Sequence, residues 1–426
     1  MLIQFKFKNF KSFRDDTILD LSATKVTEHP HHIVTIGKEK ILRTAAIYGA
    51  NASGKTNVYD ALEYMSHYVA GSFSFGGEKD TEKSGGYEKT QPFLLDTAAK
   101  DMPSSFEIYF TLNNYDGKLY NYGFTVDEKG VFEEWLNYKA ETGRKYFPIF
   151  SRSRGSEIEF PKIPKEYRDN LKVSLQDETL IVSLGAKLKV PILETIHNWF
   201  AELLFLNFGS PGMNFFLSIR MPKGFVKDPE VRKGVAAYLS TFDHGIVDFT
   251  VEEVPGSEAN TSPKYSIDAV HSVNGSKETI KIPLGQESAG TQKMFALYSP
   301  LQKVLESGGV LFVDELNARL HPLLVQDFII TFLDAKTNPN NAQLIFTTHD
   351  TWQLSSDLLR RDEIWFTAKD ENGASSLYSL VDFKGENAAK IRKDENYGKN
   401  YLQGKYGAIP ELKKITLVSE KHAKYE

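Results

Sequence analysis

Hydrophobic and polar residues alternate at the start of the chain, as they do in a strand that buries one face. The apolar face would hold Ile3, Phe5 and Phe7, and the polar face Gln4, Lys6 and Lys8. A second strand is expected at residues 17–21. Residues 41–48 form a mainly apolar run, which predicts a central parallel strand covered on both faces.

The pattern changes after residue 105, where three antiparallel strands are expected up to residue 138. The pairs Asp116-Gly117 and Lys129-Gly130 suit the tight turns of hairpins. Pro191 then opens a helix, because proline is favoured at the first helical position. Its apolar stripe predicts a core helix, with a partner-binding helix as the alternative; the stripe holds Ile192, Ile196, Trp199, Phe200 and Leu203.

A second pattern of helices and buried strands resumes near residue 278. Gly308-Gly309 ends a helix, residues 310–315 predict a buried strand, and residues 343–348 predict another. The chain is therefore expected to have an α/β fold whose first and last parts are separated by an insert.

Composition excludes several classes of protein. Without cysteine there is no disulfide frame and no thiolate metal site, which fits a cytoplasmic location. The most apolar stretch, residues 199–208, is too short to span a bilayer, so no membrane association is expected. A net charge of −5 argues against a globally basic nucleic-acid binder, but it does not exclude a local basic patch.

The clearest chemical signal is GANASGKT, residues 49–56, between the predicted strand at 41–48 and an apolar helical pattern. The spacing GxxxxGK[ST] lets backbone N–H groups surround phosphates, while Lys55 reaches the outer phosphates and Thr56 offers its hydroxyl to Mg²⁺. The alternative is an ordinary glycine-containing turn. The residues expected to contact a nucleotide here are Gly49, Asn51, Ala52, Ser53, Gly54, Lys55, Thr56 and Asn57.

Two acids follow the strand at 310–313, where phosphate-loop enzymes complete their Mg²⁺ site. Asp314 would hold the ion, and Glu315 would orient or deprotonate the attacking water. His349 follows the next strand and would lie at the same edge of the sheet, near a γ-phosphate, although such a histidine can also be structural.

A third segment, ESAGTQ at residues 287–292, begins a helical pattern. The hydroxyl of Ser288, the flexible Gly290 and the positive end of the helix suit a phosphate, and an ordinary helix cap is the alternative.

The order of these motifs resembles the ABC-type ATPases of the RecF/SMC/OLD group. The segments that carry it are KNFKSF, GANASGKT, Gln91-Pro92-Phe93, ESAGTQ, LFVDE, LNARLHP and TTHD. The sequence is more closely similar to compact bacterial phage-defence ATPases of the RloA/AbiL kind and to the AriA ATPase of PARIS systems. The resemblance covers both halves of the ATPase and the segment YLQGKYGAIP at 401–410, but not the insert.

The resemblance implies a split ABC-type P-loop ATPase head with an antiparallel β subdomain and a partly helical insert. Its expected parts are an N-terminal lobe at 1–139, an insert or lid at 140–275, a C-terminal lobe at 276–385 and a basic-aromatic tail at 386–426.

It also implies ATP and Mg²⁺ as cofactors and a head-to-head dimer that holds two ATP molecules between its subunits. Lys55, Glu315 and His349 would be catalytic, and Gln91 would join Thr56 and Asp314 around the metal. Ser288, Gly290 and Thr291 of one subunit would face the phosphate loop of the other. Arg319 and His321 are expected to contact the opposite subunit.

The expected function is that of a slow sensor or scaffold ATPase in anti-phage defence. The 77 residues after His349 hold no convincing cluster of metal-binding acids, so a separate nuclease or toxin is expected as effector. The alternatives are a RecF-like DNA-repair ATPase without an effector and a scaffold that scarcely turns over.

The tail alternates basic residues with Tyr397, Tyr401 and Tyr406, which suits single-stranded nucleic acid, a solvated helix face or an effector-docking surface. The basic residues are Arg392, Lys393, Lys399, Lys405, Lys413 and Lys414. No residue of the sequence identifies the base, so the choice between ATP and GTP stays open.

Overall fold

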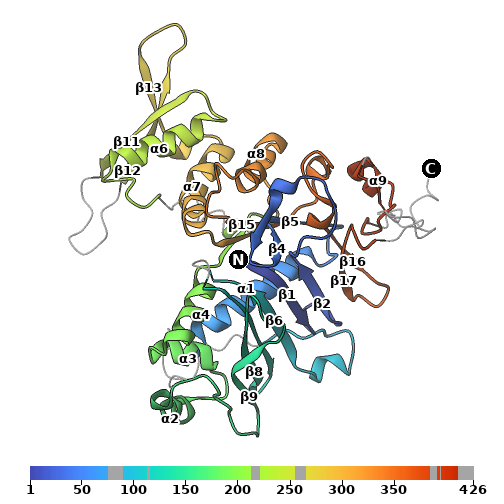
Figure 1. Cartoon of the computed structure of the whole chain (residues 1–426). Coiled ribbons are helices and arrows are strands. Elements are labelled where there is room, and N and C mark those ends of the chain that lie inside the picture. Colours follow the sequence, from blue (N-terminus) through green and yellow to red (C-terminus); the bar gives the residue numbers. More distant parts are fainter. Residues whose placement is uncertain are drawn as a thin grey trace, which may run out of the picture.

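The computed structural model describes residues 1–74, 90–112, 116–212, 221–254, 265–383, 391–393 and 395–410. These residues contain two six-stranded sheets, one mainly parallel and one antiparallel. Helices cover the sheets, and a smaller three-stranded sheet stands apart from them (Figure 1). The α/β fold predicted from the sequence is confirmed.

The mainly parallel sheet carries the predicted nucleotide-binding residues at the carboxyl ends of its strands. Its strands, in spatial order, are β10 (Leu204–Asn207), β14 (Val310–Asp314), β15 (Gln343–Thr347), β5 (Thr44–Gly49), β16 (Ile364–Lys369) and β17 (Ser375–Ser379). Neighbouring strands from β10 to β16 are parallel, and only β17 is antiparallel to its neighbour. The carboxyl ends of β5, β14, β15 and β16 therefore lie side by side at one end of the sheet.

The antiparallel sheet extends the predicted three strands on both sides. Its order is β2 (Thr17–Asp20), β1 (Leu2–Lys8), β6 (Ser104–Phe110), β7 (Lys118–Asp127), β8 (Gly130–Ala140) and β9 (Phe147–Ser153). In β1, Ile3, Phe5 and Phe7 are buried and Gln4, Lys6 and Lys8 are more exposed, so the predicted alternation of these six residues is confirmed.

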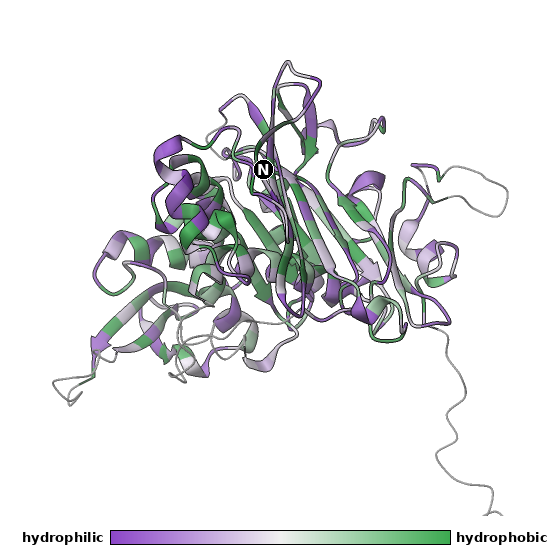
Figure 2. Ribbon diagram, turned by 90° about the horizontal axis from the view of Figure 1, so that it is seen from below, coloured by the Kyte–Doolittle hydropathy of each residue, from purple (hydrophilic) through white to green (hydrophobic). Residues whose placement is uncertain are grey.

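Two hydrophobic cores lie on opposite faces of the parallel sheet, because successive side chains of a strand point to opposite faces. Ile47 and Phe312 face the first core, which contains α1 (Lys55–Gly71) and the antiparallel sheet. Tyr48 and Val313 face the second, which contains α7 (Ala289–Ser307) and α8 (Pro322–Leu333). Figure 2 shows the hydrophobic residues concentrated along these inner strands.

The prediction of a single strand over residues 41–48 is wrong. Residues 39–42 form β4 (Glu39–Leu42), which pairs antiparallel with β3 (Ile33–Ile36). Arg43 separates β4 from β5, and its guanidinium donates to Asn341 Oδ1 at 2.8 Å. An arginine anchored in this way marks the point where the chain leaves the small hairpin and enters the central sheet.

Residues 140–275, expected as one insert, are distributed over four places. Strand β9 is an outer strand of the antiparallel sheet, and β10 is an outer strand of the parallel sheet. The helices α3 (Ile181–Lys187) and α4 (Pro191–Ala201) lie beside α1, and α2 (Lys165–Ser174) lies next to α3 (Figure 1). An outlying unit, which we call the β-arm, consists of α6 (Pro229–Ser240), β11 (Ile246–Glu253), β12 (Tyr265–Ser272) and β13 (Thr279–Pro283).

The helix predicted at Pro191 is α4, and it is a core helix. Phe200 is fully buried, and the ring of Trp199 lies 4.2 Å from that of Phe110, centroid to centroid. The apolar stripe is therefore occupied by contacts within the chain.

The C-terminal tyrosines also belong to a core. Tyr397 at the start of α9 (Tyr397–Leu402), Tyr401 and Tyr406 are all buried against the second core. Rings in this position are not available for stacking on bases, whereas Lys413 and Lys414 lie outside the described residues. Within the described ranges, no helix is both long and apolar enough to cross a membrane.

Candidate nucleotide site

The phosphate loop, GANASGKT at residues 49–56, connects β5 to α1. Its glycine and alanine residues let the backbone adopt left-handed conformations at two positions. Gly54 has φ 113° and Ala52 has φ 63°, both in the left-handed region. At Gly49, a Cβ atom would lie 2.4 Å from Thr367 Oγ1, so only glycine fits between β5 and β16. The loop therefore depends on glycine both for its turn and for close packing.

A cavity of about 410 Å³ opens over this loop. It is lined by Asn51, Ala52, Gly54, Lys55, Thr56, Asn57, Glu315 and Lys369. The predicted residue Ser53 is buried instead, with its Oγ 2.6 Å from Thr367 Oγ1. Ser53 can therefore contribute only its backbone to this cavity.

The side chain of Lys55 is folded onto its own loop. Its Nζ donates to Gly49 O at 2.9 Å and to Ala50 O at 3.2 Å. Burial lowers the pKa of Lys55, while the nearby carboxylates of Glu315 and Asp314 act in the opposite direction. A buried ammonium held only by backbone carbonyls would gain a strong interaction from a phosphate.

Thr56 and Asp314 come together although they are 258 positions apart. Thr56 Oγ1 donates to Asp314 Oδ2 at 3.0 Å, and Thr347 Oγ1 donates to Asp314 Oδ1 at 2.6 Å. Burial raises the pKa of Asp314, and these two hydrogen bonds partly oppose that rise. A hydroxyl and a carboxylate side by side supply the oxygen ligands that Mg²⁺ prefers.

Thr347 positions both acids at once. Its Oγ1 donates to Asp314 and accepts the backbone N–H of Glu315 at 2.9 Å. We expect Thr347→Val, which is nearly isosteric, to lower the free energy of unfolding by about 1–3 kcal/mol, because the partly buried N–H of Glu315 and the buried Asp314 carboxylate each lose a hydrogen bond. Denaturant unfolding measures this change.

The matched control is Thr195→Val, which removes an exposed hydroxyl that donates to Pro191 O in α4. This surface variant should stay within about 0.5 kcal/mol of the parent. Equal stabilities of the two variants would refute the role given to Thr347.

Glu315 and His349 form a pair at the mouth of the site. His349 Nδ1 lies 3.0 Å from Glu315 Oε2, and its Nε2 lies 3.2 Å from Asn317 Nδ2. Asn317 Oδ1 accepts from Thr348 Oγ1 at 2.8 Å, so the amide nitrogen of Asn317 donates to His349. His349 therefore accepts at Nε2 and donates its Nδ1–H to Glu315.

The segment ESAGTQ at residues 287–292, which we call the signature, leads into α7. Ser288 is the exposed N-cap, and its Oγ accepts from the N–H of Thr291 at 3.1 Å. Thr291 Oγ1 also lies 3.3 Å from Asp243 Oδ2 of the β-arm. Ser288, Gly290 and Thr291 are not among the residues that line the cavity over the phosphate loop of the same chain.

Gln91 lies on another side of α1. Its backbone oxygen accepts from Lys11 N at 2.6 Å, and it lines a small cavity with Lys11 and Asp60. The structure does not place Gln91 beside Thr56 or Asp314 in the cavity over the phosphate loop. Its predicted role as a metal-sensing residue stays a prediction.

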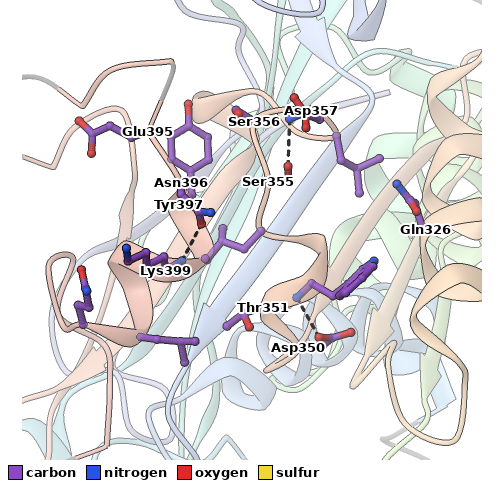
Figure 3. Close-up of a pocket in the computed structure, with 16 residues that line it drawn as sticks. Gln326, Asp350, Thr351, Ser355, Ser356, Asp357, Glu395, Asn396, Tyr397 and Lys399 are labelled. Atoms are coloured by element: carbon purple, nitrogen blue, oxygen red, sulfur yellow. Dashed lines mark hydrogen bonds between the residues drawn. The ribbon is translucent and has the colours of Figure 1, made fainter.

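The largest cavity described, of about 950 Å³, lies elsewhere. It runs between the segment after His349 and α9, and Figure 3 shows Asp350, Thr351, Tyr397 and Lys399 along its walls. None of the predicted site residues lines it. Volume alone therefore does not identify the candidate site.

Sequence reasoning missed four residues at or near the site. They are Lys369, Thr347, Asn317 and Asp243. Lys369 ends the apolar run IWFTAK, and recognising that run as a parallel strand would have placed its end beside the phosphate loop. No comparable local signal marks Asp243.

Comparison with known proteins gives one family. The sequence profile described as "AAA domain, putative AbiEii toxin, Type IV TA system" matches residues 45–352, a range that includes the phosphate loop, both acids and His349. No curated protein matches the chain.

Two solved structures are similar at low identity. The recombination mediator protein RecF with ATP in the RecFOR pathway is 12% identical, with 88% of this chain and 97% of that chain covered and a TM-score of 0.31. The cbiO1 protein from Clostridium perfringens, part of the ABC transporter complex cbiONQ, is 15% identical, with 47% and 62% covered and a TM-score of 0.22. The chain thus spans less than two thirds of cbiO1.

Proposed function

We propose that this chain, which belongs to the AAA-domain family of the AbiEii toxin type, hydrolyses ATP and controls a separate effector protein in anti-phage defence. One observation carries the ATPase part of the proposal. The phosphate loop, the Thr56–Asp314 pair and the Glu315–His349 pair surround the same edge of one parallel sheet. Phosphate binding, metal binding and water activation are needed together for hydrolysis.

The residues present fit ATP with Mg²⁺. Lys55 and the N–H groups at the start of α1 would hold the phosphates, and Thr56 with Asp314 would hold the ion. Mg²⁺, when bound, would neutralise charge that develops on the phosphates. Lys369 adds a second cation at the wall of the cavity.

Glu315 is the proposed base. Its carboxylate lines the cavity and is held by His349, which leaves the other carboxylate oxygen to accept a proton from water. Because Asn317 holds the other nitrogen of the ring, His349 is oriented and its Nδ1–H stays directed at Glu315.

A nucleotide-dependent dimer would complete the site. Ser288 is exposed at the positive end of α7 and does not line the cavity of its own chain. An exposed hydroxyl at a helix start is suited to a phosphate held by another subunit. Ser288, Gly290 and Thr291 would then close over the ATP of the partner, and the exposed Arg319 and His321 would lie near that interface.

The effector part of the proposal has separate support. The family description names a toxin–antitoxin system, which joins two proteins in one function. The β-arm touches the signature at two points, through Asp243 and Thr291 and through His271 Nε2, 2.7 Å from Glu287 Oε1. A partner that displaced the β-arm would therefore disturb the signature directly.

The test is the mass in solution of the Glu315→Gln protein, with and without ATP and Mg²⁺, alone and with the products of neighbouring genes. We expect an ATP-dependent dimer, and a neighbour that joins the assembly. Adding Ser288→Arg should leave ATP binding intact and prevent the dimer, since a bulky cation would occupy the closing surface.

Three outcomes would count against parts of the proposal. An ATP-dependent dimer indifferent to every neighbour, with salt-dependent DNA binding, would favour the RecF-like alternative. A neighbour complex that forms without nucleotide would favour a scaffold that scarcely turns over. A dimer that still forms with Ser288→Arg would remove the signature from the interface.

A further inference from the structure

Three histidines converge at a place that the proposed ATPase does not use. His29 precedes η1 (Pro30–His32), and His31 and His32 lie within it. One ring nitrogen from each lies within 4.8 Å of the others. The ring of His32 stacks on that of His29 at 4.8 Å between centroids and meets His31 edge-on at 4.4 Å. His32 is buried, His29 is half-buried and His31 is exposed, so the cluster is open to solvent on one side.

Hydrogen bonds orient two of the three rings. His32 Nδ1 lies 3.0 Å from Glu363 Oε2 and 3.1 Å from Oε1, and His29 Nε2 lies 2.7 Å from Ser356 O. A carbonyl can only accept, so His29 carries its proton at Nε2 and has a free lone pair at Nδ1. If Nδ1 of His32 donates to Glu363, its Nε2 lone pair is free as well. A carboxylate behind a histidine is the usual support of a metal-binding imidazole.

Charged groups of both signs lie around the rings. Arg43 and Arg360 are near them, and so are Asp334 and Asp362. Arg360 is already paired, with its Nη2 2.8 Å from Asp362 Oδ2.

We propose that His29, His31 and His32 bind a divalent transition-metal ion of the zinc class, at a site separate from the ATP pocket. Three imidazole nitrogens with water in a fourth position are an established set for Zn²⁺ and related ions, whereas Mg²⁺ prefers oxygen ligands. The exposed His31 gives the ion a route from solvent.

The histidine cluster lies at the amino ends of the parallel strands, and the phosphate loop lies at their carboxyl ends. His32 O accepts from Arg43 N, immediately before β5, and the phosphate loop follows the other end of that strand. Glu363 belongs to η6 (Arg361–Glu363), immediately before β16. The six residues of β5 span about 20 Å. All three ligands belong to the segment before β3, so a metal here would bind that segment and would not touch the nucleotide.

The experiment uses the full chain without a histidine tag, treated with a chelator, and titrated with Co²⁺ in the absence of nucleotide. We expect one Co²⁺ per chain with the visible absorption of a four-coordinate nitrogen site, and displacement of Co²⁺ by Zn²⁺. His31→Ala should weaken binding at least about 10-fold, and Glu363→Gln should weaken it about 10- to 100-fold. Because His31 is exposed, its loss should not unfold the protein.

Two controls separate this site from others. His244→Ala removes an exposed histidine whose Nδ1 contacts only Ser240 O among the described residues, and Asp314→Asn alters the ATP pocket. Both should bind Co²⁺ as the parent does. Binding that survives in His31→Ala but disappears in Asp314→Asn would overturn the proposal, as would a protein that binds no Co²⁺ at all. Zn²⁺ should also raise the melting temperature of the parent and not that of His31→Ala.

Discussion

Replacing Glu315 by glutamine is expected to lower the rate of ATP hydrolysis by about 100- to 10,000-fold, the contribution typical of a positioned general base. Glutamine keeps the shape of the side chain, and its amide oxygen can still accept from His349 Nδ1. What it loses is the negative charge and the capacity to take a proton from water. ATP binding should therefore persist while turnover stops.

The measurement is steady-state phosphate release beside equilibrium ATP binding. Glu230→Gln is the matched control, because Glu230 is 78% exposed in α6 and pairs only with Lys233 among the described residues. This control should hydrolyse ATP at the parental rate. A parental rate in Glu315→Gln as well would show that another group, or water alone, accepts the proton.

Replacing Lys55 by alanine is expected to weaken ATP binding by roughly 10- to 150-fold. Lys55 lines the cavity, where it can bind a phosphate. A charge-assisted hydrogen bond contributes about 1.5–3 kcal/mol, and each 1.36 kcal/mol or so corresponds to a tenfold change in affinity. The protein without nucleotide should not lose stability, because burial lowers the pKa of Lys55 and ionised lysine is therefore disfavoured in the folded state.

Thermal unfolding with and without ATP reports both effects. ATP should raise the melting temperature of the parent and not that of Lys55→Ala. Lys233→Ala, which removes an exposed amino group in α6, should behave as the parent. ATP stabilisation that survives in Lys55→Ala would contradict the placing of the phosphates in this loop.

Several elements could be predicted because neighbouring residues determine them. The alternation of Ile3, Phe5 and Phe7 was sufficient for β1, and Gly308 ends α7 with φ 65°, as a left-handed cap requires. The turn of the phosphate loop also follows from its own glycines and small residues. These features are local, so a window of a few residues contains their cause.

Other elements were missed because their partners are far away in sequence. The run at 41–48 is divided by Arg43, whose contacts lie near residues 333 and 341. The tyrosines of the tail have a pattern that fits either a core or a nucleic-acid surface, and only burial against Phe366 and its neighbours separates the two.

The sequence by itself determined the α/β class, the phosphate loop and the strands that deliver Asp314, Glu315 and His349. Only the tertiary structure decided that Thr347 holds both acids, that Lys369 reaches the cavity and that Asp243 touches Thr291. The histidine cluster likewise needs Glu363, more than 300 residues away. The physical reason is that strand order brings these residues together, and strand order depends on packing across the whole chain.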